Sequence, residues 1–190
     1  MISFSRRKSV GDAAERAYQR VVEQARQPLF FTAFGVPDTV DGRFELICLH
    51  SFLYLYRLKS ERPQSEAVSQ AFFDTMFTDM DRGLREMGTG DLSVGRHVKR
   101  MAQGFYGRIR AYQDGLEGDD TVLAGALARN LFGTVHESPE RIAAMAAYMR
   151  STAELLARQP AAELAAGNLC FPSPDLTAPE TAPSAPAASR

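Results

Sequence analysis

The chain has 190 residues, of which 45% are hydrophobic and 24% are charged, a composition that is ordinary for a globular protein. Its formal net charge of −1 excludes a surface that is basic overall, so contact with nucleic acid or an anionic membrane requires a local patch. Its two cysteines, Cys48 and Cys170, form no CxxC pair, which argues against a disulfide framework and indicates a cytoplasmic protein.

The N-terminal residues 1–12 are partly basic, and no apolar segment of the kind found in secretory signals follows them. We expect this segment to be flexible. Apolar residues then recur at helical spacing over residues 13–27, and Pro28 ends that helix. The segment PLFFTAFGVPD, which contains Gly35 and Pro37, is predicted to be a loop.

The next helix is predicted over about residues 40–59, with Asp38 or Thr39 as its N-cap. Its segment RFELICLHSFLYLYRL is apolar on nearly every side. Charged residues interrupt it at both ends, and a membrane-spanning helix needs about 20 mostly apolar residues. A helix that is apolar all round belongs at the centre of a bundle, so we predict that this helix is central.

Further helices are predicted over residues 64–87, 94–116, 120–131 and 139–160, with another turn or two in AAELAAG. Asp91 or Ser93, Asp119 or Asp120, and Ser138 are candidate caps for the later helices. The chain shows no alternating strand pattern and no internal repeat. We therefore predict an all-α, single-domain bundle of about six to seven helices over residues 13–170, followed by a disordered Pro/Ala-rich tail over 171–190.

Catalytic and ligand-binding motifs are missing from the sequence. It has no phosphate loop, no dinucleotide-binding glycine pattern, and no zinc-type spacing of Cys and His, so we predict no catalytic residue, no metal and no cofactor. Cys48 and His50 stand two residues apart and therefore face different sides of their helix. We interpret them as a core cysteine and a histidine that hydrogen-bonds to a neighbouring helix.

The helix over residues 94–116 is unusually basic near its start, with a cluster of Arg96, Lys99 and Arg100. Pairing with acidic residues of the preceding helix is the slightly favoured explanation, and binding of RNA phosphates or an acidic partner is the other. Gly104 and Gly107 stand in the middle of the same helix, where each costs about 1 kcal/mol relative to Ala. Close approach of another helix backbone, or docking of a partner, would explain them.

Methionine and phenylalanine are concentrated on the helix over residues 64–87. Most of these side chains are expected in the core, because their stripe fits simple burial of one helix face. The apolar surface is broad, however, and Met-rich surfaces suit varied apolar partners. We therefore expect one edge of this helix to remain open as a groove.

Two segments carry a family resemblance: FGVPDTVDGRFELICLHSFLYLYRLKSE, and FFDTMFTDMDRGLREMGTGDLSVGRHVKRMAQGFYGRIRAY. The chain resembles the ubiquinol–cytochrome c chaperone family, which assembles the cytochrome bc1 complex, over about residues 28–160, and it looks like a bacterial, alphaproteobacterial member. The resemblance implies a helical chaperone, not an enzyme, that binds nascent or unassembled cytochrome b. It is compatible with contact with the ribosome near its exit tunnel and with peripheral contact with the inner face of the cytoplasmic membrane. It does not suggest binding to DNA.

We predict that the client-binding site lies on the helix pair 72–87 and 94–112. The expected contact residues are Phe73, Met76, Phe77, Met80, Met87, Met101, Gly104, Phe105, Tyr106 and Gly107. The residues expected to hold acidic or phosphate groups are Arg96, Lys99, Arg100 and Arg108. A ribosome- or RNA-binding module that uses the basic helix is the alternative, and an enzyme that holds a lipid or quinone in an enclosed apolar cavity is a third hypothesis.

Overall fold

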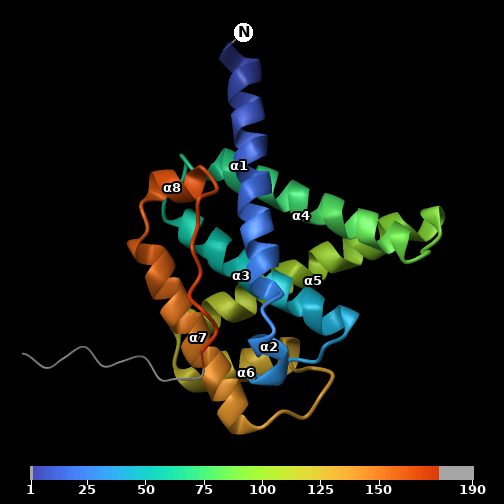
Figure 1. The fold of residues 1–190 in the computed structure, drawn as a ribbon, viewed down its shortest axis with the longest axis vertical. Helices are drawn as coiled ribbons and strands as arrows, with labels where there is room; N and C mark the ends of the chain where they lie inside the picture. Colours follow the sequence, from blue (N-terminus) through green and yellow to red (C-terminus); the bar gives the residue numbers. More distant parts are fainter. Residues whose placement is uncertain (1, 176–190) are drawn as a thin grey trace, which may run out of the picture.

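The computed structural model describes residues 2–175, and within that range the protein consists of α-helices without a β-strand (Figure 1). The helices are α1 (Ile2–Ala25), α2 (Leu29–Thr32), α3 (Val40–Lys59), α4 (Glu66–Glu86), α5 (Asp91–Glu117), α6 (Asp120–Asn130), α7 (Pro139–Arg158) and α8 (Ala161–Ala165). The predicted all-α, single-domain fold is confirmed. In the described residues, no helix is both long and apolar enough to cross a bilayer.

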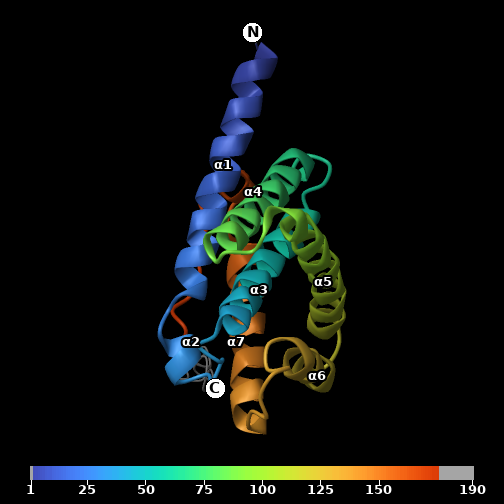
Figure 2. The same cartoon turned by 90° about the vertical axis from the view of Figure 1, so that its right-hand side faces the viewer.

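Helix α3 lies at the centre of the bundle, as its composition predicts. It contacts α1, α4, α5, α7 and α8, and Figures 1 and 2 show these helices arranged around it. Leu46 and Leu49 on one side of α3, Cys48 and Phe52 on a second and Tyr54 on a third are all fully buried. A helix surrounded by other helices must be apolar on every side, which explains its sequence pattern.

Short polar side chains begin three of the helices at the predicted places. Thr39, Asp119 and Ser138 each accept hydrogen bonds from backbone N–H groups in the first turns of α3, α6 and α7. Helix α5 begins differently, because it is preceded by Gly90 and no side chain caps it. Asp91 instead lies in its first turn, where a negative charge interacts favourably with the helix dipole.

Two segments near the N-terminus differ from the sequence-based expectation. Helix α1 begins at Ile2 and so includes residues that we expected to be flexible. Helix α2 forms one turn inside the predicted loop, because Phe30 and Phe34 are both fully buried. The Phe30 ring lies 5.1 Å from the ring of Tyr148, which fastens this turn to α7.

The beginning of the C-terminal tail is packed against the bundle, which corrects the prediction of disorder from residue 171. Phe171 packs edge-on to the ring of His50 at 5.3 Å, and Gln24 donates a hydrogen bond to the Pro172 carbonyl at 2.7 Å. Gly167 permits the approach to α1, since its φ is +81° and a Cβ there would lie 2.2 Å from the Ala13 carbonyl oxygen. The rest of the predicted tail, residues 176–190, lies outside the described residues.

Helices α4 and α5 form an arm that extends from the body and closes at residues 87–90 (Figure 1). Gly88, with φ +83°, makes the turn at the tip. Away from the tip the two helices diverge, and α3 packs against both. The arm therefore carries all the residues that the sequence suggests for client binding.

Candidate functional site

An open groove of about 330 Å³ lies where α3, α4 and α5 meet, and we call it the aromatic groove. Its apolar lining consists of Phe52, Leu55, Tyr56, Phe73, Tyr106 and Ile109. Its polar lining consists of Lys59, Arg62, Glu66, Ser69, Gln70 and Gln113. An apolar hollow with a few surrounding polar groups is the usual form of a site that binds an apolar ligand.

A pair of stacked rings joins the two helices of the arm at this groove. The centroids of Phe73 and Tyr106 lie 5.5 Å apart, with their planes 30° from parallel. The Phe73 ring also packs against the Phe77 ring, with their centroids 4.6 Å apart, whereas the Tyr106 side chain is 60% exposed. The Tyr106 ring therefore offers apolar surface on a rigid support, and a partner that covered it would gain from its burial.

Three of the predicted contact residues belong to the core and are not available to a client. Met76 and Phe105 are fully buried, and Phe77 is only 8% exposed. They lie on the sides of α4 and α5 that pack into the bundle, so their expected role in client contact is wrong. Met80 and Met101 are half-buried against the same core. Met87 is 58% exposed, but it lies at the tip of the arm and does not line the aromatic groove.

The two mid-helix glycines of α5 have different surroundings, and no other helix backbone lies close to either of them. A Cβ on Gly104 would lie 2.8 Å from Nη1 of Arg108, so this glycine makes room for a guanidinium group. A Cβ on Gly107 would meet nothing within 4 Å. The fold therefore explains Gly104, whereas the packing of this chain gives no reason for Gly107.

Arg108 is engaged inside the protein, which corrects its predicted role as a free basic contact. Its Nε donates to Oε2 of Glu45 at 2.6 Å, and its Nη2 donates to the other carboxylate oxygen. The hydrogen bonds with Glu45 raise the pKa of Arg108. The pair is mostly buried between α5 and α3, and the guanidinium also lies over the ring of Phe44. The sequence does hold a signal for this ion pair, because Glu45 is a carboxylate in an otherwise apolar stretch of its helix and therefore needs a cationic partner.

The remaining basic residues of the prediction, Arg96, Lys99 and Arg100, are exposed on α5. In the part of the chain that the structure describes, none of them has a hydrogen-bond or ion-pair partner. The slightly favoured explanation, pairing with acidic residues of α4, is therefore wrong. Those carboxylates are used elsewhere, since Asp81 and Asp79 pair with arginines of α4 itself.

His50 and Cys48 are core residues, as the sequence analysis expected. The His50 ring bridges two helices, with Nε2 2.9 Å from the Tyr148 hydroxyl and Nδ1 2.8 Å from the Leu46 carbonyl oxygen. Burial lowers the pKa of His50 to about 4, and burial raises the pKa of the Cys48 thiol. Among the described residues, no cluster of three or more His, Cys, Asp and Glu side chains could hold a metal ion.

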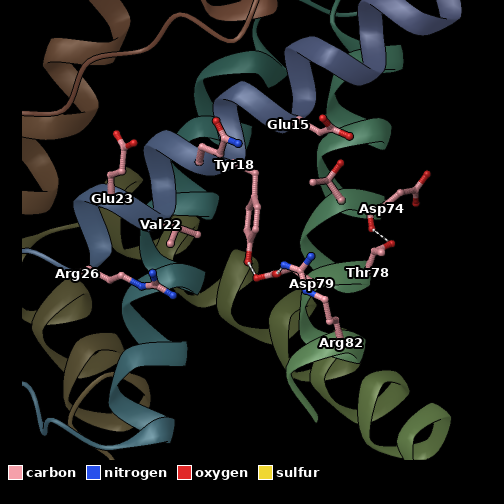
Figure 3. Close-up of a pocket in the computed structure, with 11 residues that line it drawn as sticks. Glu15, Tyr18, Val22, Glu23, Arg26, Asp74, Thr78, Asp79 and Arg82 are labelled. Atoms are coloured by element: carbon pink, nitrogen blue, oxygen red, sulfur yellow. Dashed lines mark hydrogen bonds and ion pairs between the residues drawn. The ribbon is translucent and has the colours of Figure 1, made fainter. Parts of the chain in front are cut away.

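A second hollow, of about 730 Å³, lies between α1 and α4 and differs from the aromatic groove in its chemistry (Figure 3). Tyr18 reaches across it from α1 and donates a hydrogen bond to Asp79 at 2.8 Å. Its charged lining residues are Glu15, Glu23, Arg26, Asp74, Asp79 and Arg82. Carboxylates and guanidinium groups on both walls make this cleft unsuitable for an apolar segment.

Comparisons with known proteins bear on the whole bundle. A family model described as Ubiquinol-cytochrome C chaperone matches residues 32–171. The ubiquinol-cytochrome-c reductase complex assembly factor 1 of Xenopus laevis is 28% identical over 144 residues, which cover 76% of this chain and 72% of that protein. The human protein of the same name is 29% identical over 144 residues, and the match covers 76% of this chain but only 48% of the human protein.

A solved structure extends the likeness to the fold. The crystal structure of the Cbp3 homolog from Brucella abortus is 38% identical to this chain and superposes with a TM-score of 0.79. The match covers 93% of this chain and 98% of that one. Since the family model also spans most of the sequence, the chain belongs to the ubiquinol–cytochrome c chaperone family, a family of assembly chaperones and not of enzymes.

Proposed function

We propose that this protein is an assembly chaperone of the cytochrome bc1 complex that binds newly made cytochrome b through the aromatic groove. Its family membership and its similarity to assembly factors of the ubiquinol–cytochrome c reductase complex support the assembly role. The proposed binding site is inferred from one observation: the exposed Tyr106 ring is stacked on Phe73 at the edge of an apolar groove.

The physical task of such a chaperone is to cover apolar surface. A segment of a membrane protein that is still in water exposes apolar side chains, and their burial is favourable by roughly 25 cal/mol per Å². The aromatic groove is at the small end of ligand-pocket volumes, so it accepts a few side chains and not a whole helix. Such limited burial gives reversible binding, and the client is released without a nucleotide or a covalent step.

Gly107 supports the same site from a separate observation. It follows Tyr106 directly, is exposed, and has open space where a Cβ would be. A glycine in the middle of a helix lowers stability by about 1 kcal/mol relative to alanine, and nothing in this fold compensates for it. A client backbone that lies close to α5 beside Tyr106 would account for its presence.

The test is complementation of a strain that lacks this protein, with cytochrome b measured from its absorption spectrum in isolated membranes. Wild type should restore cytochrome b, whereas Tyr106→Ser should restore only part of it. The matched control is Val122→Ser, which removes another exposed apolar side chain, on α6 and outside the groove. Normal bc1 content in the uncomplemented strain would refute the assembly role, and full restoration by Tyr106→Ser would refute the groove as the site.

A further inference from the structure

The outward side of α5 carries a row of cations that client binding does not use. We call Arg96, Lys99, Arg100 and Arg110 the basic face. All four are exposed, and their helical positions lie opposite the buried side chains of Val94, Phe105 and Tyr112. Figure 2 shows α5 along one edge of the molecule, with α3 and α4 on its inner side.

None of these four cations forms an ion pair or a side-chain hydrogen bond within the part of the chain that the structure describes. Several exposed arginines elsewhere pair with carboxylates close in sequence, such as Arg43 with Asp38 at 2.7 Å and Arg20 with Glu23 at 3.0 Å. Arg96 and Arg100 stand one turn apart and repel each other, which costs a few tenths of a kcal/mol. The basic face is therefore a local positive field on a chain whose formal net charge is −1.

The shape of the basic face indicates which polyanion it fits. From Arg96 to Arg110 the helix rises by about 21 Å; three of the cations lie within one turn of each other, about 6 Å, and Arg110 lies at the other end. None of them lines the aromatic groove or the other hollows described on the surface. A bound strand or peptide is normally held in a groove, whereas cations exposed along an outer edge, outside any groove, match a plane of phosphate groups.

Tyr106 lies beside the basic face on the side toward α4, where its ring lines the aromatic groove and is assigned to the client. Among the α5 side chains that the structure describes, no other large apolar one is strongly exposed. Attachment there would be electrostatic and shallow, without insertion into the hydrocarbon.

We propose that the basic face is the surface by which this protein docks on an anionic lipid bilayer. The docking goes beyond the binding of cytochrome b and does not depend on it. Each cation near an anionic surface strengthens binding by about fivefold, and this attraction decays within the Debye length of about 10 Å at 0.1 M salt. Docking through this edge would hold the aromatic groove close to the membrane.

The test is flotation of the purified full chain with vesicles of phosphatidylcholine alone or mixed with phosphatidylglycerol, at low and high salt. The wild type should float with the anionic vesicles at low salt only. Arg96→Gln combined with Arg100→Gln should weaken this binding by about 25-fold. Arg20→Gln combined with Arg158→Gln, which makes the same change in net charge at exposed residues outside α5, should bind like wild type.

Competition separates the possible anions. Single-stranded RNA at the same phosphate concentration should not displace the protein from anionic vesicles, and neither should inorganic phosphate. Equal flotation with neutral vesicles would overturn the proposal, and so would an equal loss in the two double variants. Tight binding to RNA with no flotation would overturn it as well and would assign the basic face to nucleic acid. Circular dichroism of each variant confirms that the fold is intact.

Discussion

The two glycines of α5 allow a sharp test, because the same substitution should have different effects on stability at positions three residues apart. In Gly107→Ala the new methyl group meets no atom within 4 Å, so only the helix propensity changes. Alanine is favoured over glycine by about 0.5–1 kcal/mol in a helix interior. We therefore expect the free energy of unfolding to rise by about that amount.

In Gly104→Ala the new methyl group would lie 2.8 Å from Nη1 of Arg108. The guanidinium must then move, and it makes a bidentate contact with the mostly buried Glu45 carboxylate. Hydrogen bonds to charged groups contribute about 1.5–3 kcal/mol, so weakening them offsets the gain in helix propensity. We expect Gly104→Ala to give no gain, or a loss on the order of 1 kcal/mol.

Urea denaturation, followed by circular dichroism, measures the free energy of unfolding of both variants. In thermal unfolding, each 1 kcal/mol should shift the Tm of a chain of this size by about 2–4 °C. Client binding provides the second readout: Gly107→Ala should weaken the association with cytochrome b although it stabilises the fold. Destabilisation by Gly107→Ala, or equal shifts in the two variants, would refute the assignment of Gly104 to packing and Gly107 to function.

Three further predictions concern the body of the protein. Arg108→Met should lower the free energy of unfolding, measured in urea, by about 3–5 kcal/mol, because it leaves the Glu45 carboxylate buried without its partner. A loss below about 0.5 kcal/mol would show that the ion pair does not stabilise the fold. The free energy of unfolding should fall as the pH drops from 6.5 toward 4, by up to about 1.4 kcal/mol per pH unit. The reason is that His50 is protonated first in the unfolded chain, because burial keeps its pKa near 4 in the folded protein. His50→Gln should remove this contribution, and an unchanged pH profile in that variant would contradict it. Leu53→Ala should cost about 2–5 kcal/mol if α3 is the centre of the bundle, whereas a cost typical of surface positions would place that helix at the periphery.

The sequence predicts helices well in this protein, because each one has its own local signals. The caps at Thr39, Asp119 and Ser138 and the all-round apolar character of α3 depend only on neighbouring residues. Helix α2 is missed for the opposite reason. Its single turn exists because Phe30 and Phe34 pack against α3 and α7, and such long-range contacts leave no periodic pattern in a short segment.

The candidate site is only partly predictable, because a stripe of apolar residues does not show which of its edges a neighbouring helix covers. Phe73 and Phe77 stand one helical turn apart, yet Phe73 lines the aromatic groove while Phe77 is nearly buried. Arg108 and Arg110 look equivalent in sequence, but only Arg108 meets Glu45, which is distant in the chain. Leu55 and Tyr56 line the groove although they belong to the central helix, because both are only half-buried on the side of α3 that faces the groove.

The central claim is that an unfinished membrane polypeptide lies against the aromatic groove. Residue-specific photo-crosslinking tests it most directly, with a crosslinking amino acid placed at Tyr106 and, in a separate variant, at Val122, another exposed apolar residue, on α6. In a translation reaction that makes cytochrome b, we expect a covalent product from position 106 and little from position 122. Equal products from the two positions, or a product from position 122 alone, would contradict this account.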